Sequence, residues 1–312
     1  MVFRPAAALI VLGCVLVLAG CGSSGKSSDG VSTTTTTAAP PGSLEALWRD
    51  GGEAVAVVPG TSDYGTGANR VSFLIVDKQS QLIEEPKARI WIARGLKQKP
   101  FANATATLEP IGIPGGAKAD AQNIYVTTVT TPTPGKYWIL AQPTGGKKIR
   151  ALGNLVVRKQ AAAPEVGDRA IPSRNPTLEP NAPVKSVRAA TTAEPPDLNL
   201  LRTTVAAAMA AKRPFVVTFA TPLFCQTKTC GPVVQVVQSV ARNWQSKGVD
   251  FIHIEIYKHN DPAKGTNRWV NEWKLPTEPF TFVADRTGVI RTRLEGAFSP
   301  AELDAAVRKV AT

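Results

Sequence analysis

The pattern of apolar and polar residues changes twice along this chain of 312 residues. Between residues 44 and 160, short apolar runs are separated by Gly, Pro, Asn and Asp, a pattern typical of strands joined by turns. Residues 161–197 are rich in proline, which removes a backbone donor and interrupts helices, so we expect an irregular linker there. From residue 198 to residue 312, helical and strand-like runs alternate. The pattern therefore predicts two folded regions joined by a linker.

The first region has the short strands of an all-β domain. Runs of this length with turn signals between them predict an antiparallel sandwich. The segment "TPTPGKYWIL", which contains Tyr137, resembles the tyrosine corner of immunoglobulin-like domains. The resemblance implies an immunoglobulin-like β-sandwich over 44–160, without the inter-sheet disulfide because this region has no cysteine. The region also has no histidine, so we expect a spacer or binding module.

The second region predicts an α/β arrangement. "LLRTTVAAAMAAK" and "GPVVQVVQSVARNWQSKG" have the spacing of helices, whereas "RPFVVTFA", "DFIHIEIY" and "PFTFVADRTGVIRTRLEG" predict strands. The final run, "SPAELDAAVRKV", begins with a capping box, with Ser299 as the N-cap, Pro300 at the first helical position and Glu302 at the third. We therefore expect a sheet packed with helices between residues 198 and 312.

The first residues have the proportions of an export signal. Arg4 precedes an apolar run from Ala6 to Gly20, which is short for a permanent membrane span. The sequence "LAGC", ending at Cys21, resembles the bacterial lipobox. This resemblance implies a signal peptide over 1–20, lipid on Cys21, a flexible tether over 21–43 and a membrane-anchored protein of the bacterial cell envelope. An ordinary signal peptide with an incidental cysteine is the alternative.

The net charge of +12 does not indicate a nucleic-acid partner. Nucleic-acid proteins concentrate basic residues on one face or in one arm. Here the basic excess is spread over both folded regions, with no basic tail or cluster. We interpret it as a solvated basic surface.

The stretch "TPLFCQTKTCGP" carries the candidate chemistry. Once Cys14 leaves with the signal and Cys21 carries lipid, Cys225 and Cys230 are the remaining cysteines, and export places them where disulfides form. A thiolate at the first turn of a helix is stabilised by free backbone N–H groups and by the helix dipole. A second thiol within reach can then release a mixed disulfide. Lys228, between the two, would add positive charge.

The order helix, strand, cysteine pair, helix, strand, hairpin, helix resembles the thioredoxin superfamily over 198–312. The resemblance implies a thioredoxin-like α/β domain, with a central mixed sheet flanked by helices and no bound cofactor. It also implies that Cys225 attacks and Cys230 resolves. The segment "TEPF" matches the family's cis-proline, which implies that Pro279 and Glu278 lie on the substrate-binding surface. The expected partners are thiols or disulfides of exported proteins, or a membrane redox partner.

Two departures from the family pattern leave alternatives open. Four residues separate the cysteines where the family usually has two, and Thr218 falls near the place of the family's buried acid. A structural disulfide on a non-catalytic binding protein therefore remains a rival to an enzyme. A copper chaperone is a minor alternative, although no histidine follows Pro279 and we expect no metal ligands. His253 and Glu255 share one face of a strand, where they would tune a thiol or lie in a half-buried polar layer.

Overall fold

The computed structural model describes residues 38–311. The predicted signal peptide, the predicted lipidation site at Cys21 and most of the predicted tether lie outside the described residues. Within the described part of the chain, none of the helices combines the length and the apolar character that crossing a bilayer requires.

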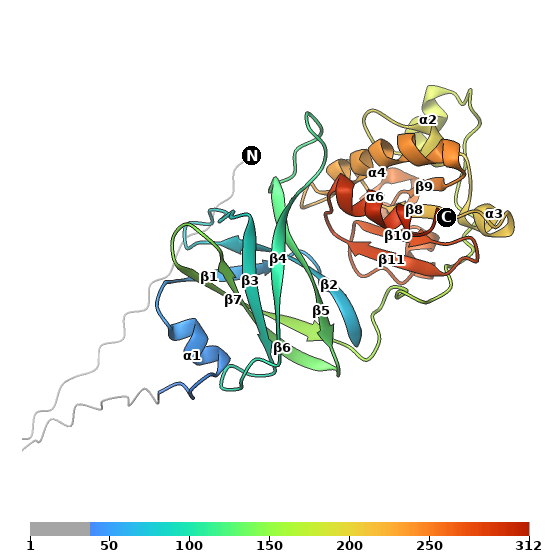
Figure 1. Ribbon diagram of the computed structural model, residues 1–312. Helices are drawn as coiled ribbons and strands as arrows, with labels where there is room; N and C mark the ends of the chain where they lie inside the picture. The colour runs from blue at the N-terminus through green and yellow to red at the C-terminus, as the bar shows by residue number, and fades with distance from the viewer. Residues whose placement is uncertain (1–37, 312) are drawn as a thin grey trace, which may run out of the picture. The chain divides into compact units, whose positions relative to one another are not determined.

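Seven strands of the first region form a closed barrel in the order β1-β2-β5-β4-β3-β6-β7 (Figure 1). β1 pairs antiparallel with β2 on one side and parallel with β7 on the other, which closes the sheet. A short helix, α1 (Leu44–Arg49), precedes the barrel and is capped by Ser43. The strands are β1 (Glu53–Pro59), β2 (Gly67–Val76), β3 (Lys87–Ala93), β4 (Ala102–Pro110), β5 (Asn123–Thr131), β6 (Gly135–Pro143) and β7 (Ile149–Val157).

Alternation of side chains fills the barrel interior. Val71, Phe73 and Ile75 of β2 are each buried, as are Ile90 and Ile92 of β3, because every second residue of a strand points to the same face. These residues belong to one apolar cluster with residues of the other barrel strands. The barrel therefore has its own core.

The fold class expected from the sequence is wrong. The dominant sheet is a closed seven-stranded barrel, which is neither an immunoglobulin-like sandwich nor a central mixed sheet flanked by helices, and the remaining strands form a second, small sheet. A sandwich leaves sheet edges, whereas the parallel pairing of β1 with β7 removes them. The Tyr137 hydroxyl does donate to the Thr133 carbonyl at 2.5 Å, so a tyrosine bond to nearby backbone also occurs in this barrel.

The second sheet has four strands in the order β11-β10-β8-β9. β8 and β9 are parallel, and β10 is antiparallel to both β8 and β11. All five residues of β8 and of β10 are buried, which explains why their sequences are continuous apolar runs. The strands are β8 (Phe215–Phe219), β9 (Asp250–Ile254), β10 (Phe280–Ala284) and β11 (Ile290–Glu295).

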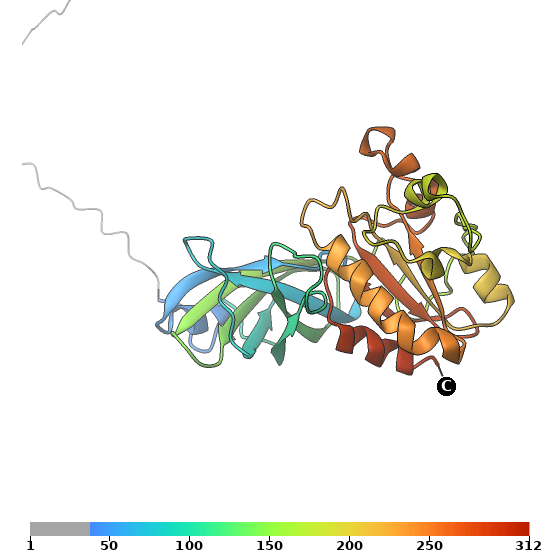
Figure 2. The same ribbon diagram turned by 90° about the horizontal axis from the view of Figure 1, so that it is seen from above.

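Helices pack on this second sheet. α4 (Cys230–Trp244) and α6 (Pro300–Arg308) lie side by side, and their apolar residues share one core with Val216 of β8 and Val283 of β10 (Figure 2). The Ser299 hydroxyl accepts from Glu302 N at 3.1 Å, which confirms the predicted N-cap of α6. The shorter helices are α2 (Val184–Ala190), η1 (Leu198–Leu201), α3 (Val205–Ala210), η2 (Gln245–Lys247), η3 (Lys258–Asn260), η4 (Pro262–Lys264) and α5 (Arg268–Glu272).

The stretch 161–197 is more ordered than its prolines predict. It contains α2, which lies between Pro183 and the next proline, so the expectation of no regular element is wrong there. Its residues 167–170 bond to the start of β11, with Gly167 N and Ile290 N each donating across at 2.9 Å. The segment is therefore tied to the second sheet by backbone bonds.

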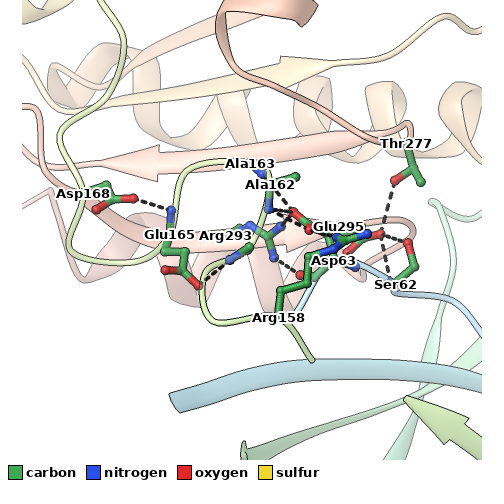
Figure 3. A network of polar contacts seen from close by, with 11 residues as sticks. Ser62, Asp63, Arg158, Ala162, Ala163, Glu165, Asp168, Thr277, Arg293 and Glu295 are labelled. Atoms are coloured by element: carbon green, nitrogen blue, oxygen red, sulfur yellow. Dashed lines mark hydrogen bonds and ion pairs between the residues drawn. The ribbon is translucent and has the colours of Figure 1, made fainter. Parts of the chain in front are cut away.

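A buried polar network joins a barrel loop to β11 (Figure 3). The Asp63 carboxylate is fully buried, pairs with Arg293 and Arg158, and accepts from the backbone of Ala162 and Ala163. Glu295 accepts from the backbone of Asp63 at 3.0 Å. We call Asp63, Arg158, Arg293 and Glu295 the junction network.

Candidate functional site

The two cysteines lie where β8 leads into α4. Cys225 is in the loop after β8, and Cys230 is the first residue of α4. Both are free thiols; Cys225 is 9% exposed and Cys230 is 0% exposed. Lys228 N donates to the Cys225 carbonyl at 3.2 Å, so a tight turn brings the second cysteine back toward the first. The two sulfurs are thereby held together, with only one near the surface.

Hydrogen bonds stabilise Cys225 as a thiolate. The Cys230 thiol donates to its sulfur, and this bond is the largest cause that holds the pKa of Cys225 at about 5. Burial opposes this shift, while Thr227, Thr229 and Cys230 N, at 3.6, 3.8 and 3.3 Å from the sulfur, add to it. Cys225 is thus ionised at neutral pH, when a thiol becomes a nucleophile.

Cys230 is in the opposite state. Burial raises its pKa, and the hydrogen bond to Cys225 and the negative charge on that sulfur raise it further. Its sulfur also lies 3.8 Å from Oε2 of Glu278, so its single proton can be donated either to the Cys225 sulfur or to that carboxylate. Cys230 therefore keeps its proton while Cys225 is charged, and the Glu278 carboxylate lies next to that proton.

Glu278 lies at the edge of β10, next to both cysteines. The Glu278–Pro279 peptide is cis, and β10 begins at the following residue. Burial raises the pKa of Glu278 to about 7, and the charge of Cys225 adds to this rise, while the bond from Cys230 opposes it. A carboxyl group with this pKa can both accept and release a proton near neutrality. Sequence resemblance placed Glu278 on the substrate surface, and the structure adds its bond to Cys230.

Three residues expected to tune the thiols have other contacts. Lys228 adopts a left-handed φ of 54° and forms an ion pair with Asp120 of the barrel at 3.3 Å. His253 is buried, with Nε2 3.0 Å from the Ala220 carbonyl and Nδ1 near Thr191. His253 is thus buried, and its polar partners are Ala220 and Thr191 rather than either cysteine.

Glu255 influences the two cysteines indirectly, through Glu278. Its Oε1 accepts from the backbone N–H and the hydroxyl of Thr192, in the stretch 161–197. Its charge is one cause of the raised pKa of Glu278. The structure therefore links Glu255 to the cysteines through Glu278.

The hydroxyl groups between the cysteines were not singled out from the sequence. The Thr227 and Thr229 hydroxyls lie 2.7 Å from each other and 3.6 and 3.8 Å from the Cys225 sulfur, so either can donate to it. The signal was present in "CQTKTC", where a hydroxyl residue stands two and four places after the first cysteine. Hydroxyl donors of this kind stabilise a thiolate.

Within residues 38–311, no group of three or more His, Cys, Asp and Glu side chains is arranged to hold a metal ion.

Comparisons with known proteins give distant structural matches. No family model matches the chain, and no curated protein matches it. A solved thiol:disulfide interchange protein of the thioredoxin family from Chlorobium tepidum TLS has 16% identity and a TM-score of 0.26, and the match covers 35% of this chain and 86% of that one. A second, from Chlorobium tepidum and described as thiol:disulfide interchange protein DsbE, has 15% identity and a TM-score of 0.29, over 47% of this chain and 99% of that one.

These distant neighbours are thioredoxin-family proteins, and they match only part of the chain. At TM-scores this low, the likeness carries no conclusion about what this chain does.

Proposed function

We propose that the protein is a thiol–disulfide oxidoreductase of the cell envelope, anchored by lipid on Cys21 and acting on exported proteins through Cys225 and Cys230. One observation carries the proposal: a thiolate at Cys225 is bonded to a buried, protonated Cys230. A disulfide staple does not require its reduced form to hold one sulfur charged and one protonated. An exchange centre does, because attack needs a thiolate and resolution needs a second thiol.

The first step is attack on a partner disulfide. The Cys225 thiolate forms a bond to one partner sulfur, the partner's S–S bond breaks, and the electron pair leaves on the second partner sulfur, which takes a proton from water. The product is a mixed disulfide between Cys225 and the partner. Attack at Cys225 is favoured over attack at Cys230 because Cys225 is both ionised and nearer the surface.

The second step resolves the mixed disulfide. Glu278 accepts the proton of Cys230, whose thiolate attacks the Cys225 sulfur. The bond from Cys225 to the partner breaks, and the partner leaves as a thiolate that is then protonated. Two electrons have passed from the dithiol to the partner, and Cys225 and Cys230 are joined. The same steps in reverse oxidise a partner dithiol.

Paired serine variants of the full chain test this assignment. Cys225→Ser should lower exchange with hydroxyethyl disulfide by about three orders of magnitude or more, because a hydroxyl is not ionised near neutrality. Cys230→Ser should still attack but accumulate the mixed disulfide, detected as a mass increase on the intact protein. The folded state of both variants is checked by circular dichroism.

The rival, a binding protein with a structural disulfide, gives the opposite results. Its reduction potential would lie below about −300 mV, and both serine variants would lower thermal stability equally without any mixed disulfide. A potential within the span of known exchange proteins, roughly −120 to −270 mV, supports the proposal.

A further inference from the structure

A loop of the barrel reaches the start of α4, next to the dithiol. Ala117 N, in this β4–β5 loop (111–122), donates to Gln235 Oε1 of α4 at 2.6 Å. Asp120 of the same loop pairs with Lys228, which lies between the cysteines. Ile113 packs against the apolar core that includes both cysteines. The barrel is therefore in contact with the segment that carries the cysteines.

A glycine allows this close approach. Gly112 has a φ of +84°, and a Cβ added there would lie 3.1 Å from Cβ of Pro232 in the first turn of α4. A side chain at this position would be strained by the backbone and crowded by the helix. The loop thus follows α4 closely because residue 112 has no side chain.

A cavity of about 400 Å³ lies between the barrel and the dithiol. Thr227, Thr229 and Glu278 line one side, and the two threonine hydroxyls are the ones that bond to the Cys225 sulfur. The cavity therefore begins beside the nucleophile. The barrel lines the other side mainly with apolar residues, namely Val58, Pro59, Leu74, Ile111, Ala121 and Ile124.

The wall of the cavity favours apolar groups. Its lining contains Asp120, Glu278 and Glu295 and no Lys, Arg or His, but Asp120 is paired with Lys228 and the pKa of Glu278 is about 7. An extended polypeptide segment with apolar side chains would bury them against the barrel wall.

We propose that the barrel is half of the substrate site: the cavity binds the apolar side chain next to the reactive cysteine of an extended polypeptide segment. The partner sulfur has to meet Cys225, so the residues that flank it in the partner are the ones brought to the cavity mouth. The barrel wall then selects, among exported proteins, cysteines flanked by apolar residues. This inference rests on the proposed function and adds its substrate class.

Two peptide disulfides and one small disulfide test the inference on the full chain. The peptides differ only in the residue next to cysteine, Leu in one and Gly in the other, and hydroxyethyl disulfide is the small neutral substrate. The wild-type kcat/KM should be about tenfold higher for the Leu peptide, the gain expected from burying one apolar side chain. The difference in kcat/KM between the Leu and Gly peptides should come from a lower KM for the Leu peptide.

Substitutions in the barrel wall test whether the cavity causes the preference for the Leu peptide. Val58→Glu and Leu74→Glu place a fourth carboxylate in the cavity and should remove the preference for the Leu peptide, so that the two peptides react at equal rates. Val58 is 41% exposed, so its replacement should not disturb the fold. The matched control is Val156→Glu, since Val156 is 57% exposed on another barrel strand and does not line the cavity. It should keep the full preference.

The outcomes separate this inference from the proposed function. No exchange by the wild type with any of the three substrates overturns both. Exchange with hydroxyethyl disulfide but equal rates for the two peptides overturns the inference alone. The same holds if Val58→Glu keeps the preference as Val156→Glu does.

Discussion

The junction network and the dithiol site both bury acidic groups, but the two carboxyl groups differ in the partners that surround them. The Asp63 carboxylate has two arginine partners and backbone donors. Glu278 has no ion pair among the described residues; it accepts hydrogen bonds from the Thr221 backbone and from Tyr257, and it lies next to the thiolate of Cys225 and the thiol of Cys230. A buried charge without a partner shifts its pKa, whereas a paired one holds structure. The first cluster therefore fixes the chain and the second prepares it for proton transfer.

The largest expected effect on stability comes from the junction network. Asp63→Asn leaves Arg293 without its charged partner and sets an amide donor against backbone N–H groups. We expect the free energy of unfolding to fall by about 3–5 kcal/mol, as for other buried ion pairs that lose one partner. Denaturant-induced unfolding measures this, and exchange of the folded variant with hydroxyethyl disulfide should not change. A loss below about 1 kcal/mol would contradict a structural role for the pair.

The next effect concerns Glu278. Glu278→Gln removes the acceptor for the Cys230 proton and should slow resolution of the mixed disulfide by about 10²-fold near neutrality, the size typical of a lost general base. In the wild type this rate should rise as pH passes through the pKa of Glu278, which in the mixed disulfide lies below about 7 because Cys225 is then uncharged, and the variant should lose that inflection. Single-turnover reactions that are quenched at successive times and analysed by mass spectrometry measure both the rate of resolution and its dependence on pH. Equal pH profiles for the two proteins would rule Glu278 out as the acceptor.

The same variant makes a separate prediction for stability. The pKa of Glu278 is higher in the folded chain than its ordinary value of 4.5, so the folded state binds more protons between about pH 4.5 and pH 7. Glu278 therefore lowers stability as pH rises through that window. The Gln variant should gain stability relative to the wild type over the same range, the reverse of the direction expected for Asp63→Asn. Urea unfolding at pH 4 and pH 8 tests the sign.

The smallest expected effect on stability comes from Arg158, the exposed member of the junction network. Arg158 pairs with Asp63 at 3.1 Å, but its side chain is 57% exposed. Arg158→Ala should therefore cost no more than about 1 kcal/mol, because water screens the pair and Arg293 remains. A loss as large as that of Asp63→Asn would show that both arginines are needed to compensate the buried carboxylate.

Local pattern predicted the strands and the helix cap, because each depends on neighbouring residues. Closure of the barrel depends on β1 meeting β7, which lies about one hundred residues later, as in the pairing of Glu53 with Ile149. No local signal distinguishes that pairing from the two open sheets of a sandwich, so the sandwich prediction was wrong. Similarly, α2 forms in a proline-rich stretch because its own seven residues contain none.

The sequence predicted the two cysteines of the candidate site, but it did not predict the contacts that other parts of the chain make with them. The spacing of Cys225 and Cys230 before a helical run is a local signal. The ion pair between Lys228 and Asp120 is a contact across the chain, and it directs Lys228 to the barrel. The role of Glu278 depends on a thiol 48 positions away. The contact between Cys230 and Glu278 could therefore be assigned only from the folded chain.

The segment 161–197 has a consequence for association between copies of the protein. A strand at the edge of a sheet offers unpaired backbone groups to other chains, which is a common start of aggregation. Residues 167–170 cover the beginning of β11 with backbone hydrogen bonds. The barrel needs no such cover because it is closed. The segment 161–197 would therefore hinder strand pairing between copies of the protein at the β11 edge of the second sheet.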